Sequence, residues 1–231
     1  MPKFTLNQFR KSEETCFLKI TDLKKDLKIA EGGKITTWVS RSENKKNAEA
    51  VAASGSYRAI SKTRPPKQWG LNFNNSLYVI KGISLSSGLA CVTFKLGFFG
   101  LAEELSSEES EQFIFGDEYR GVSSTGKHIY IYGVNNSSNK IAIKYTTPVD
   151  TWNTVLVQWL PDVGEQGMYK INDSNSATFS CNQQKYLEKI ELGGRGNSSL
   201  KGSIAIFEVY SHWKEIVPDV MINLIMRDHD I

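Results

Sequence analysis

The chain has few cysteines, and none of them has the spacing of a metal site. Its 231 residues contain Cys16, Cys91 and Cys181, far apart and without a C-x-x-C pair. A cysteine-based zinc or redox motif is therefore excluded. A bridge between Cys91 and Cys181 stays open, although Cys91 lies in an apolar stretch and is typical of a buried, small hydrophobic side chain.

Long hydrophobic runs are also missing. No stretch approaches the ~20 apolar residues that a membrane-spanning helix requires, and residues 1–17 lack the apolar run of a secretory signal. The sequence therefore predicts a soluble protein without a membrane span, made without secretory export.

The chain has no large excess of positive or negative charge. The formal net charge is +3, and lysines and arginines are spread along the chain, so we expect no nucleic-acid partner. One acidic segment, EELSSEESE at 103–111, has too few apolar residues to pack. We expect this segment to be a solvent-exposed loop rather than a cation site, because nothing holds its carboxylates rigidly. We expect no metal ligands and no cofactor, while Ca²⁺ in a loop stays open.

Catalytic signatures are absent as well. The sequence has no Ser-His-Asp order, phosphate-binding loop or zinc spacing. Glu188 and Glu191 lie three apart, which puts them on opposite faces of a strand and prevents them from acting as a pair. His212 and His229 stand alone and are expected to be surface or hydrogen-bonded histidines. We therefore predict no catalytic residues.

What the chain does contain is a succession of strand patterns, organised around residues 200–210. This stretch follows a strand at 190–192 that ends in Gly193–Gly194. Its apolar residues occupy both alternating positions, which is typical of a strand covered on both faces.

Other strands follow from alternation and from β-branched or aromatic composition. They are expected at 34–39, 91–98, 112–116, 127–133, 141–145, 152–160 and 168–173, with a hairpin over 69–79. The stretch 91–98 should have one solvated or lightly covered side. Pro218 can start a helix over 219–226 whose apolar face packs on the sheets.

Two stretches give weaker signals. Residues 1–30 read as irregular or partly helical, with a short helical turn capped by Thr21. Residues 41–66 are polar and read as a long surface loop, with one helical turn at 48–53. No linker divides the chain, so we expect one domain over 1–231. Its fold class is all-β: an antiparallel two-sheet jelly-roll sandwich with a short C-terminal helix.

Three segments resemble a known family. They are ITTWVSRSENKKNA at 35–48 with the hairpin GLNFNNSLY at 70–78, WNTVLVQW at 152–159 with Tyr169–Asn172, and IELGG at 190–194 continuing to Tyr210. Together they are similar to laminin-G-like, concanavalin A-like jelly-roll domains, in a variant found in microbial and viral proteins such as phage fibres. Ser40, Glu43 and Asp173 depart from the family pattern. The resemblance implies the fold and a role in recognition.

One strand presents aromatic side chains that could bind a ligand. Ile129 and Ile131 face one way, and His128, Tyr130 and Tyr132 face the other. Sugars stack on flat rings, and such rings supply much of the contact energy at interfaces. The alternative, which sandwich strands favour, is that the rings fill the second face of a covered strand. The five tryptophans are expected in the core: Trp38, Trp69, Trp152, Trp159 and Trp213.

The sequence thus predicts a non-catalytic binding module for a glycan or a protein surface. The resemblance implies a virion, fibre or capsid-associated component, located in the virion or the cytoplasm and assembled as a homo-oligomer or within a larger complex. Two alternatives stay open: a carbohydrate-active lyase or hydrolase, and a purely structural subunit.

Overall fold

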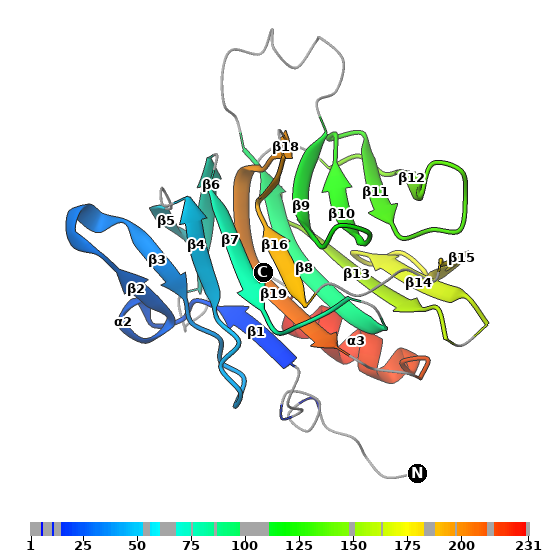
Figure 1. The fold of residues 1–231 in the computed structure, drawn as a ribbon, viewed down its shortest axis with the longest axis horizontal. Coiled ribbons are helices and arrows are strands. Elements are labelled where there is room, and N and C mark those ends of the chain that lie inside the picture. Colours follow the sequence, from blue (N-terminus) through cyan, green and yellow to red (C-terminus); the bar gives the residue numbers. More distant parts are fainter. Residues whose placement is uncertain are drawn as a thin grey trace, which may run out of the picture.

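The computed structural model describes most of the chain. The described residues are 6, 11, 15–52, 56–60, 68–74, 76–85, 87–97, 111–147, 151–162, 164–182, 188–196, 198–211 and 215–229. Strands dominate, every pairing is antiparallel, and two large sheets face each other (Figure 1). The predicted all-β sandwich with a short C-terminal helix is confirmed.

The first sheet, sheet A, has the order β15–β14–β13–β8–β19–β6–β5, with β1 also paired to β19. Its strands are β1 (Thr15–Lys19), β5 (Ser56–Ile60), β6 (Gln68–Asn74), β8 (Gly88–Leu96), β13 (Asn153–Leu160), β14 (Gln166–Ile171), β15 (Ala177–Ser180) and β19 (Lys201–Ser211).

The second sheet, sheet B, has the order β12–β11–β10–β9–β16–β7–β4–β3–β2. Its strands are β2 (Leu27–Ile29), β3 (Ile35–Trp38), β4 (Ala48–Ala52), β7 (Leu77–Lys81), β9 (Gln112–Gly116), β10 (Gly121–Ser124), β11 (His128–Tyr132), β12 (Lys140–Lys144) and β16 (Lys189–Leu192). A small ribbon joins β17 (Gly194–Arg195) to β18 (Ser198–Ser199), and the helices are α2 (Leu23–Asp26), the 3₁₀ turn η1 (Glu31–Gly33) and α3 (Asp219–Asp228).

β19 is the strand on which sheet A is built. On one side it pairs with β8 over most of its length, and on the other with β6 and then with β1. All of its residues after Lys201 are buried. The predicted strand between two covering layers is therefore confirmed, and it explains why apolar residues occupy both of its faces.

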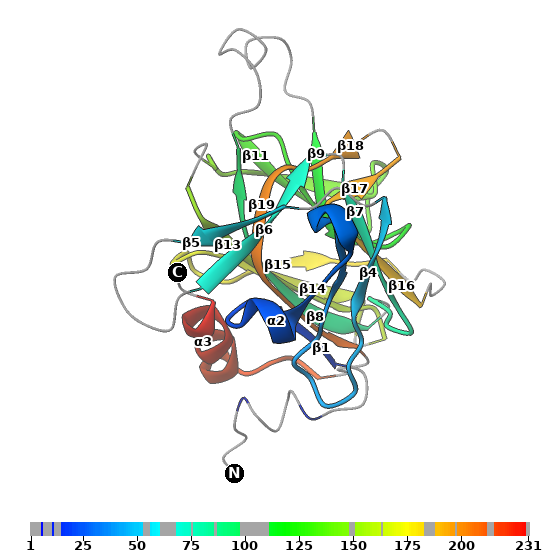
Figure 2. The same ribbon diagram turned by 90° about the vertical axis from the view of Figure 1, so that its left-hand side faces the viewer.

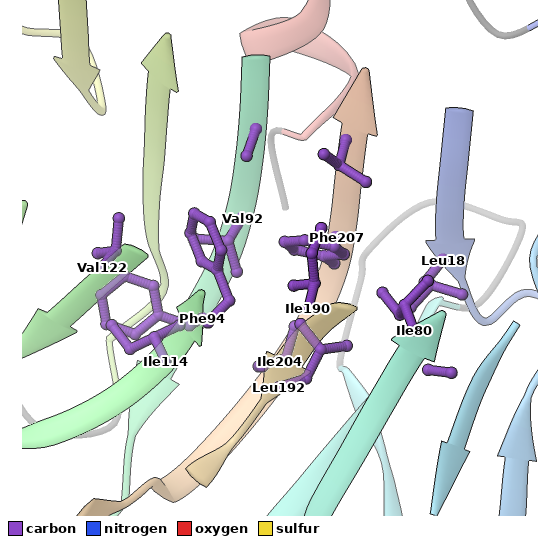
Figure 3. Packing of buried hydrophobic residues seen from close by; sticks show 14 of the residues in the cluster. Leu18, Ile80, Val92, Phe94, Ile114, Val122, Ile190, Leu192, Ile204 and Phe207 are labelled. Carbon is purple, nitrogen blue, oxygen red and sulfur yellow. The ribbon is translucent and has the colours of Figure 1, made fainter. Parts of the chain in front are cut away.

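Side chains from the two sheets interdigitate in the interior (Figure 3). Sheet A contributes Phe94 and Phe207, and sheet B contributes Phe115, whose ring centroid lies 5.1 Å from that of Phe207. Trp38 and Trp159 are fully buried, as predicted. Trp69 and Trp152 are only half-buried, and Trp213 lies outside the described residues.

The closing helix covers the outer face of sheet A. α3 lies on the side of sheet A that faces away from sheet B (Figure 2). Its Met221, Ile222 and Ile225 pack against Leu89 and Cys91 of β8. The predicted helix and its packing are confirmed, and this packing explains why the second side of β8 is buried instead of solvated.

The predicted hairpin over 69–79 is wrong. β6 belongs to sheet A and β7 to sheet B, so the chain crosses between the sheets at this turn. The aromatic residues of the two strands meet inside the sandwich: the rings of Phe73 and Tyr78 make an edge contact with centroids 5.7 Å apart. Two adjacent strands and a turn signal do not distinguish a hairpin from such a crossing.

The long loop predicted over 41–66 is confirmed at 41–47, but the loop and the helical turn at 48–53 are wrong in the later described residues, because 48–52 and 56–60 are strands. In β4, Ala48 is buried, while the neighbouring Glu49 carboxylate accepts a 2.8 Å hydrogen bond from the Thr37 hydroxyl. The alanines favour a helix intrinsically, but pairing with β3 and β7 decides the outcome.

The irregular segment predicted over 1–30 needs correction too. Thr15–Lys19 is a buried strand of sheet A, and Leu27–Ile29 is a strand of sheet B. The short helical turn exists as α2, but its N-cap is Asp22, whose side chain accepts from the backbone N–H of Lys24. Thr21 instead donates its own backbone N–H to Asp26.

All three cysteines are free and buried, so the bridge left open between Cys91 and Cys181 is not formed. The Cys16 thiol donates to the backbone oxygen of Lys46 at 2.8 Å. Burial raises the pKa of Cys16 to about 12 and also raises the pKa of Cys181.

These environments predict that the native protein does not react with a thiol reagent at pH 8. A thiol-specific reagent should label no cysteine of the folded chain and all three after unfolding in denaturant without reductant. Fast labelling of the folded protein, or fewer than three reactive thiols after unfolding, would contradict the buried thiol environments.

Candidate ligand-binding site

The predicted ligand residues lie together on the outer face of sheet B. His128, Tyr130 and Tyr132 are half-buried along β11, while Ile129 and Ile131 point into the core. The ring centroids of His128 and Tyr130 are 6.1 Å apart. We call these three residues the aromatic face.

A lysine covers part of this aromatic face. The Lys140 ammonium lies 4.4 Å from the Tyr130 ring centroid and 5.5 Å from that of Tyr132. It also lies 2.6 Å from the Glu111 carboxylate, which accepts from the Tyr132 hydroxyl as well. A sugar stacked on these rings would have to displace Lys140 from a cation–π contact and from its ion pair.

A pocket opens on the opposite sheet, in a region that the sequence prediction did not point to. It has a volume of about 410 Å³ and lies on the outer face of sheet A, beside the C-terminal end of α3. We call it the Trp152 pocket. Its lining residues are Thr93, Trp152, Thr154, Lys170, Asn172, Asp173, Asn223, Met226, Arg227 and His229.

Trp152 forms the apolar wall of this pocket and is held in place from behind. Its half-buried indole packs against Phe17, Ala205 and Ile206. The Lys95 ammonium lies 5.3 Å from the ring centroid. A ring fixed in this way needs little ordering when a ligand stacks on it.

The floor of the pocket is a buried network of hydrogen bonds. The Thr93 hydroxyl lies 2.9 Å from the Thr154 hydroxyl and 3.0 Å from Nδ1 of His229. Nε2 of His229 lies 3.4 Å from the Glu208 carboxylate, and both side chains are fully buried. Burial lowers the pKa of His229. The prediction that His229 is a hydrogen-bonded histidine is met, while His212 lies outside the described residues.

The turn after β14 supplies the polar end of the pocket. Asn172 adopts a left-handed conformation with φ of 46°. Its side chain accepts from the backbone N–H of Thr154 at 2.6 Å and donates to the Tyr145 hydroxyl at 2.6 Å. These bonds fix the turn, and the next residue, Asp173, is exposed.

Two cations stand near this end. The Lys170 ammonium donates to the Asn223 side-chain oxygen at 3.0 Å, which leaves further N–H groups on the same nitrogen. Arg227 is exposed in the last turn of α3. Within the part of the chain that the structure describes, neither Arg227 nor Asp173 forms an ion pair. The pocket thus offers both donors and an acceptor to a ligand.

Among the described residues, carboxylates at this pocket and metal-binding clusters are scarce. Asp173 is the one carboxylate among the described residues that line it. Across the described ranges, no three His, Cys, Asp or Glu side chains gather closely enough to hold a metal ion. In the same ranges, the helices are too short or too polar to cross a membrane.

The sequence did not predict this pocket, because its residues lie between positions 93 and 229 in three strands, in the segments next to those strands, and in and just after α3. Trp152 was assigned to the core, and Asn172–Asp173 was recognised only as a turn. Each feature has an ordinary structural explanation by itself. One signal did point to this region. The predicted helix over 219–226 has an apolar face, and that face has to pack against one of the sheets.

Comparison with known proteins places the fold. No family model and no curated protein matches the sequence. Among solved structures, the chain is similar to the binding domain of Paraclostridial Mosquitocidal Protein 1, with 12% identity and a TM-score of 0.60 over 90% of this chain and 53% of that one. It is also similar to the receptor-binding domain of botulinum neurotoxin type G, with 13% identity and a TM-score of 0.59 over 92% of this chain and 50% of that one.

A third similar structure is domain 4 of AbnA, a GH43 extracellular arabinanase from Geobacillus stearothermophilus, in complex with arabinotriose. It has 12% identity and a TM-score of 0.52 over 85% of this chain and 91% of that one. The chain spans about half the length of the first two binding domains. At such low identity these similarities show the fold alone, which is the antiparallel β-sandwich of jelly-roll type.

Proposed function

We propose that this protein is a non-catalytic module that binds a glycan in the Trp152 pocket. The observation that carries the proposal is the mixed lining: a fixed indole, side-chain amides, one carboxylate and two cations surround a cavity of about 410 Å³. Small-molecule sites commonly have volumes of roughly 300–1,000 Å³.

This lining suits a sugar better than other small ligands. A sugar ring has an apolar face of C–H groups that can stack on an indole, and hydroxyls that both donate and accept. Asp173 can accept from hydroxyls, while Lys170 and Arg227 can donate to them. An apolar ligand would desolvate these three groups without replacing their hydrogen bonds, and an inorganic anion would leave the indole unused.

The similar structures support a recognition role. Two are named as binding domains, one of them the receptor-binding domain of a neurotoxin, and the arabinanase domain was solved in complex with arabinotriose. A carbohydrate-active enzyme remains the alternative. Hydrolysis of a glycoside generally requires two carboxyl groups on either side of the bond, and a single described carboxylate lines this pocket.

The wider context stays a prediction. Kinship with laminin-G-like and concanavalin A-like domains, the virion or fibre setting, and assembly as a homo-oligomer rest on the sequence resemblance. The arrangement as a single domain over 1–231 rests on the absence of a dividing linker in the sequence, and Ca²⁺ in a loop stays open. The mass of the native protein, measured with and without a chelator, tests the assembly and the ion directly.

Replacing Trp152 tests the site. Trp152→Ala should weaken binding to the best ligand from a glycan array by at least about 10-fold, or about 1.4 kcal/mol, because it removes the stacking wall. Trp152→Phe keeps a ring and should retain most of the affinity. Isothermal titration calorimetry measures each constant, and thermal unfolding confirms that each variant is folded.

Tyr130→Ala is the matched control on the aromatic face. It should bind the same ligand with unchanged affinity if the Trp152 pocket is the site. Loss of binding in Tyr130→Ala but not in Trp152→Ala would transfer the function to the aromatic face, as the sequence pattern predicted. Absence of binding to any glycan would leave the protein without the proposed function.

A further inference from the structure

The charges around the Trp152 pocket are unequal. Lys170 and Arg227 line it, and Asp173 is the acidic residue among its described lining. A third cation, Lys95, lies 5.3 Å from the Trp152 ring centroid. His229 does not add to this charge at neutral pH, because burial lowers its pKa. The described groups at the pocket therefore carry a net positive charge.

Two neighbouring carboxylates, both among the described residues, do not cancel the charges of Lys170 and Arg227. Asp228 follows Arg227 in α3, but its carboxylate lies 3.8 Å from the Lys19 ammonium, which also donates to the Asp228 backbone oxygen at 3.1 Å. Glu208 lies beneath the floor, beside His229 and the Tyr210 hydroxyl, and is fully buried. Neither carboxylate lines the pocket.

The end of α3 opposes an anion only weakly. The carboxyl end of a helix carries roughly half a negative charge. Here the backbone N–H of His229 caps the carbonyl groups of Ile225 and Met226. Against this partial charge stand the full charges of Lys170 and Arg227, and a guanidinium can hold a carboxylate through two parallel hydrogen bonds.

We propose that the Trp152 pocket selects an acidic saccharide, which is a sugar ring that carries one anionic group. The ring stacks on Trp152, the anionic group meets Lys170 and Arg227, and a hydroxyl donates to Asp173. This inference rests on the proposed glycan-binding function and adds the charge of the ligand to it. A carboxylate and a sulfate share the required chemistry.

Three matched ligands test the inference: a neutral galactose trisaccharide, the same trisaccharide with one galacturonate residue in place of one galactose, and the same neutral trisaccharide carrying one sulfate. Calorimetry should show the uronate binding at least about 10-fold more tightly than the neutral form. The difference should shrink as salt rises from about 0.05 to about 0.5 M, because the cations are solvent-accessible. Comparison of the uronate with the sulfate identifies the preferred anionic group.

Four variants locate the charge effect. Lys170→Gln and Arg227→Gln should each remove most of the preference for the acidic ligand, while Asp173→Asn should keep it. Lys144→Gln is the matched control, since it removes an exposed lysine from β12 in the other sheet. It should leave the preference unchanged, which separates local contact from net charge. Thermal unfolding verifies the fold of each variant.

The outcomes distinguish the two proposals. If neutral and acidic ligands bind equally and Trp152→Ala abolishes both, the charge selection is wrong and the glycan-binding function stands. If Lys144→Gln reduces the preference as much as Lys170→Gln, selection by this pocket is also wrong. If no saccharide binds, the proposed function itself fails.

Discussion

Gly193→Ala is expected to lower the free energy of unfolding by about 2–5 kcal/mol. Gly193 has a φ of +80° between β16 and β17, and its backbone bonds to Ile114 and Leu200 fix the turn. A Cβ atom at this position would overlap the ring of Phe73. The left-handed conformation costs roughly 1–2 kcal/mol, and forcing Phe73 out of a filled core costs roughly 1–3 kcal/mol more. Urea unfolding monitored by tryptophan fluorescence measures the sum.

Gly196→Ala separates the two contributions. Gly196 has a φ of +57°, but nothing lies within 4 Å of the added Cβ atom. Only the conformational cost applies there, so its loss should be roughly 1–2 kcal/mol. Equal losses in the two variants would show that the Phe73 ring can move at no cost in free energy. The sandwich interior would then be less tightly packed at this point than the structure indicates.

The accuracy of the sequence predictions follows from how local each signal is. β8, β11 and β19 are predicted as strands because alternation and composition are encoded in each strand itself. In β11 and β19 the pattern also gives the burial of each face, whereas the second face of β8 is buried by α3, which the strand does not encode. The membership of a strand in one sheet or the other is not local. β6 and β7 look like a hairpin, and only the contact between Phe73 and Tyr78 across the interior shows that they belong to opposite sheets.

Weakly patterned strands are missed for a related reason. β4 contains three alanines and a glutamate, which favour a helix intrinsically, and its pairing with β3 and β7 makes it a strand. β1 follows a highly charged segment, and its burial depends on β19, which lies almost 200 residues away in the chain. Pairing over such distances cannot be inferred from a short window of sequence.

The candidate sites also differ in how far local sequence signals determine them. The alternation in β11 correctly predicts that His128, Tyr130 and Tyr132 share one outward face. Lys140 covers part of that face because the β11–β12 register places it opposite Tyr132, and this detail follows from the turn geometry rather than from composition. The Trp152 pocket exists only where α3 crosses the sheet, and no pattern in the sequence specifies that crossing.

The buried histidine beneath the pocket predicts a dependence of stability on pH. The ring of His229 is fully buried between Thr93 and Glu208. Charged groups face it from each adjoining element: Glu208 from β19, Lys19 from β1 and Asp228 from α3. Burial lowers its pKa most strongly, while Glu208 and Asp228 act in the opposite direction. The folded state therefore binds a proton less readily than the unfolded chain.

The sign follows from this difference. The unfolded histidine has a pKa of about 6.5. Above that pH, His229 is neutral in both the folded and the unfolded state, so it adds no pH dependence to the free energy of unfolding. As the pH falls below about 6.5, the unfolded chain gains a proton that the folded chain excludes, and stability falls by up to about 1.4 kcal/mol per pH unit until the lower pKa of the folded state is reached.

His229→Gln isolates this effect. The amide keeps a polar side chain beside Glu208 but does not titrate, so the variant should lose little stability between pH 6.5 and 5.5, whereas the unsubstituted protein loses about 1 kcal/mol. Urea unfolding at several pH values in this window gives both slopes, and the difference between them removes the shared contribution of other groups. If His229→Gln keeps the full pH dependence, another buried group controls the response to acid and the excluded proton at His229 is not its source.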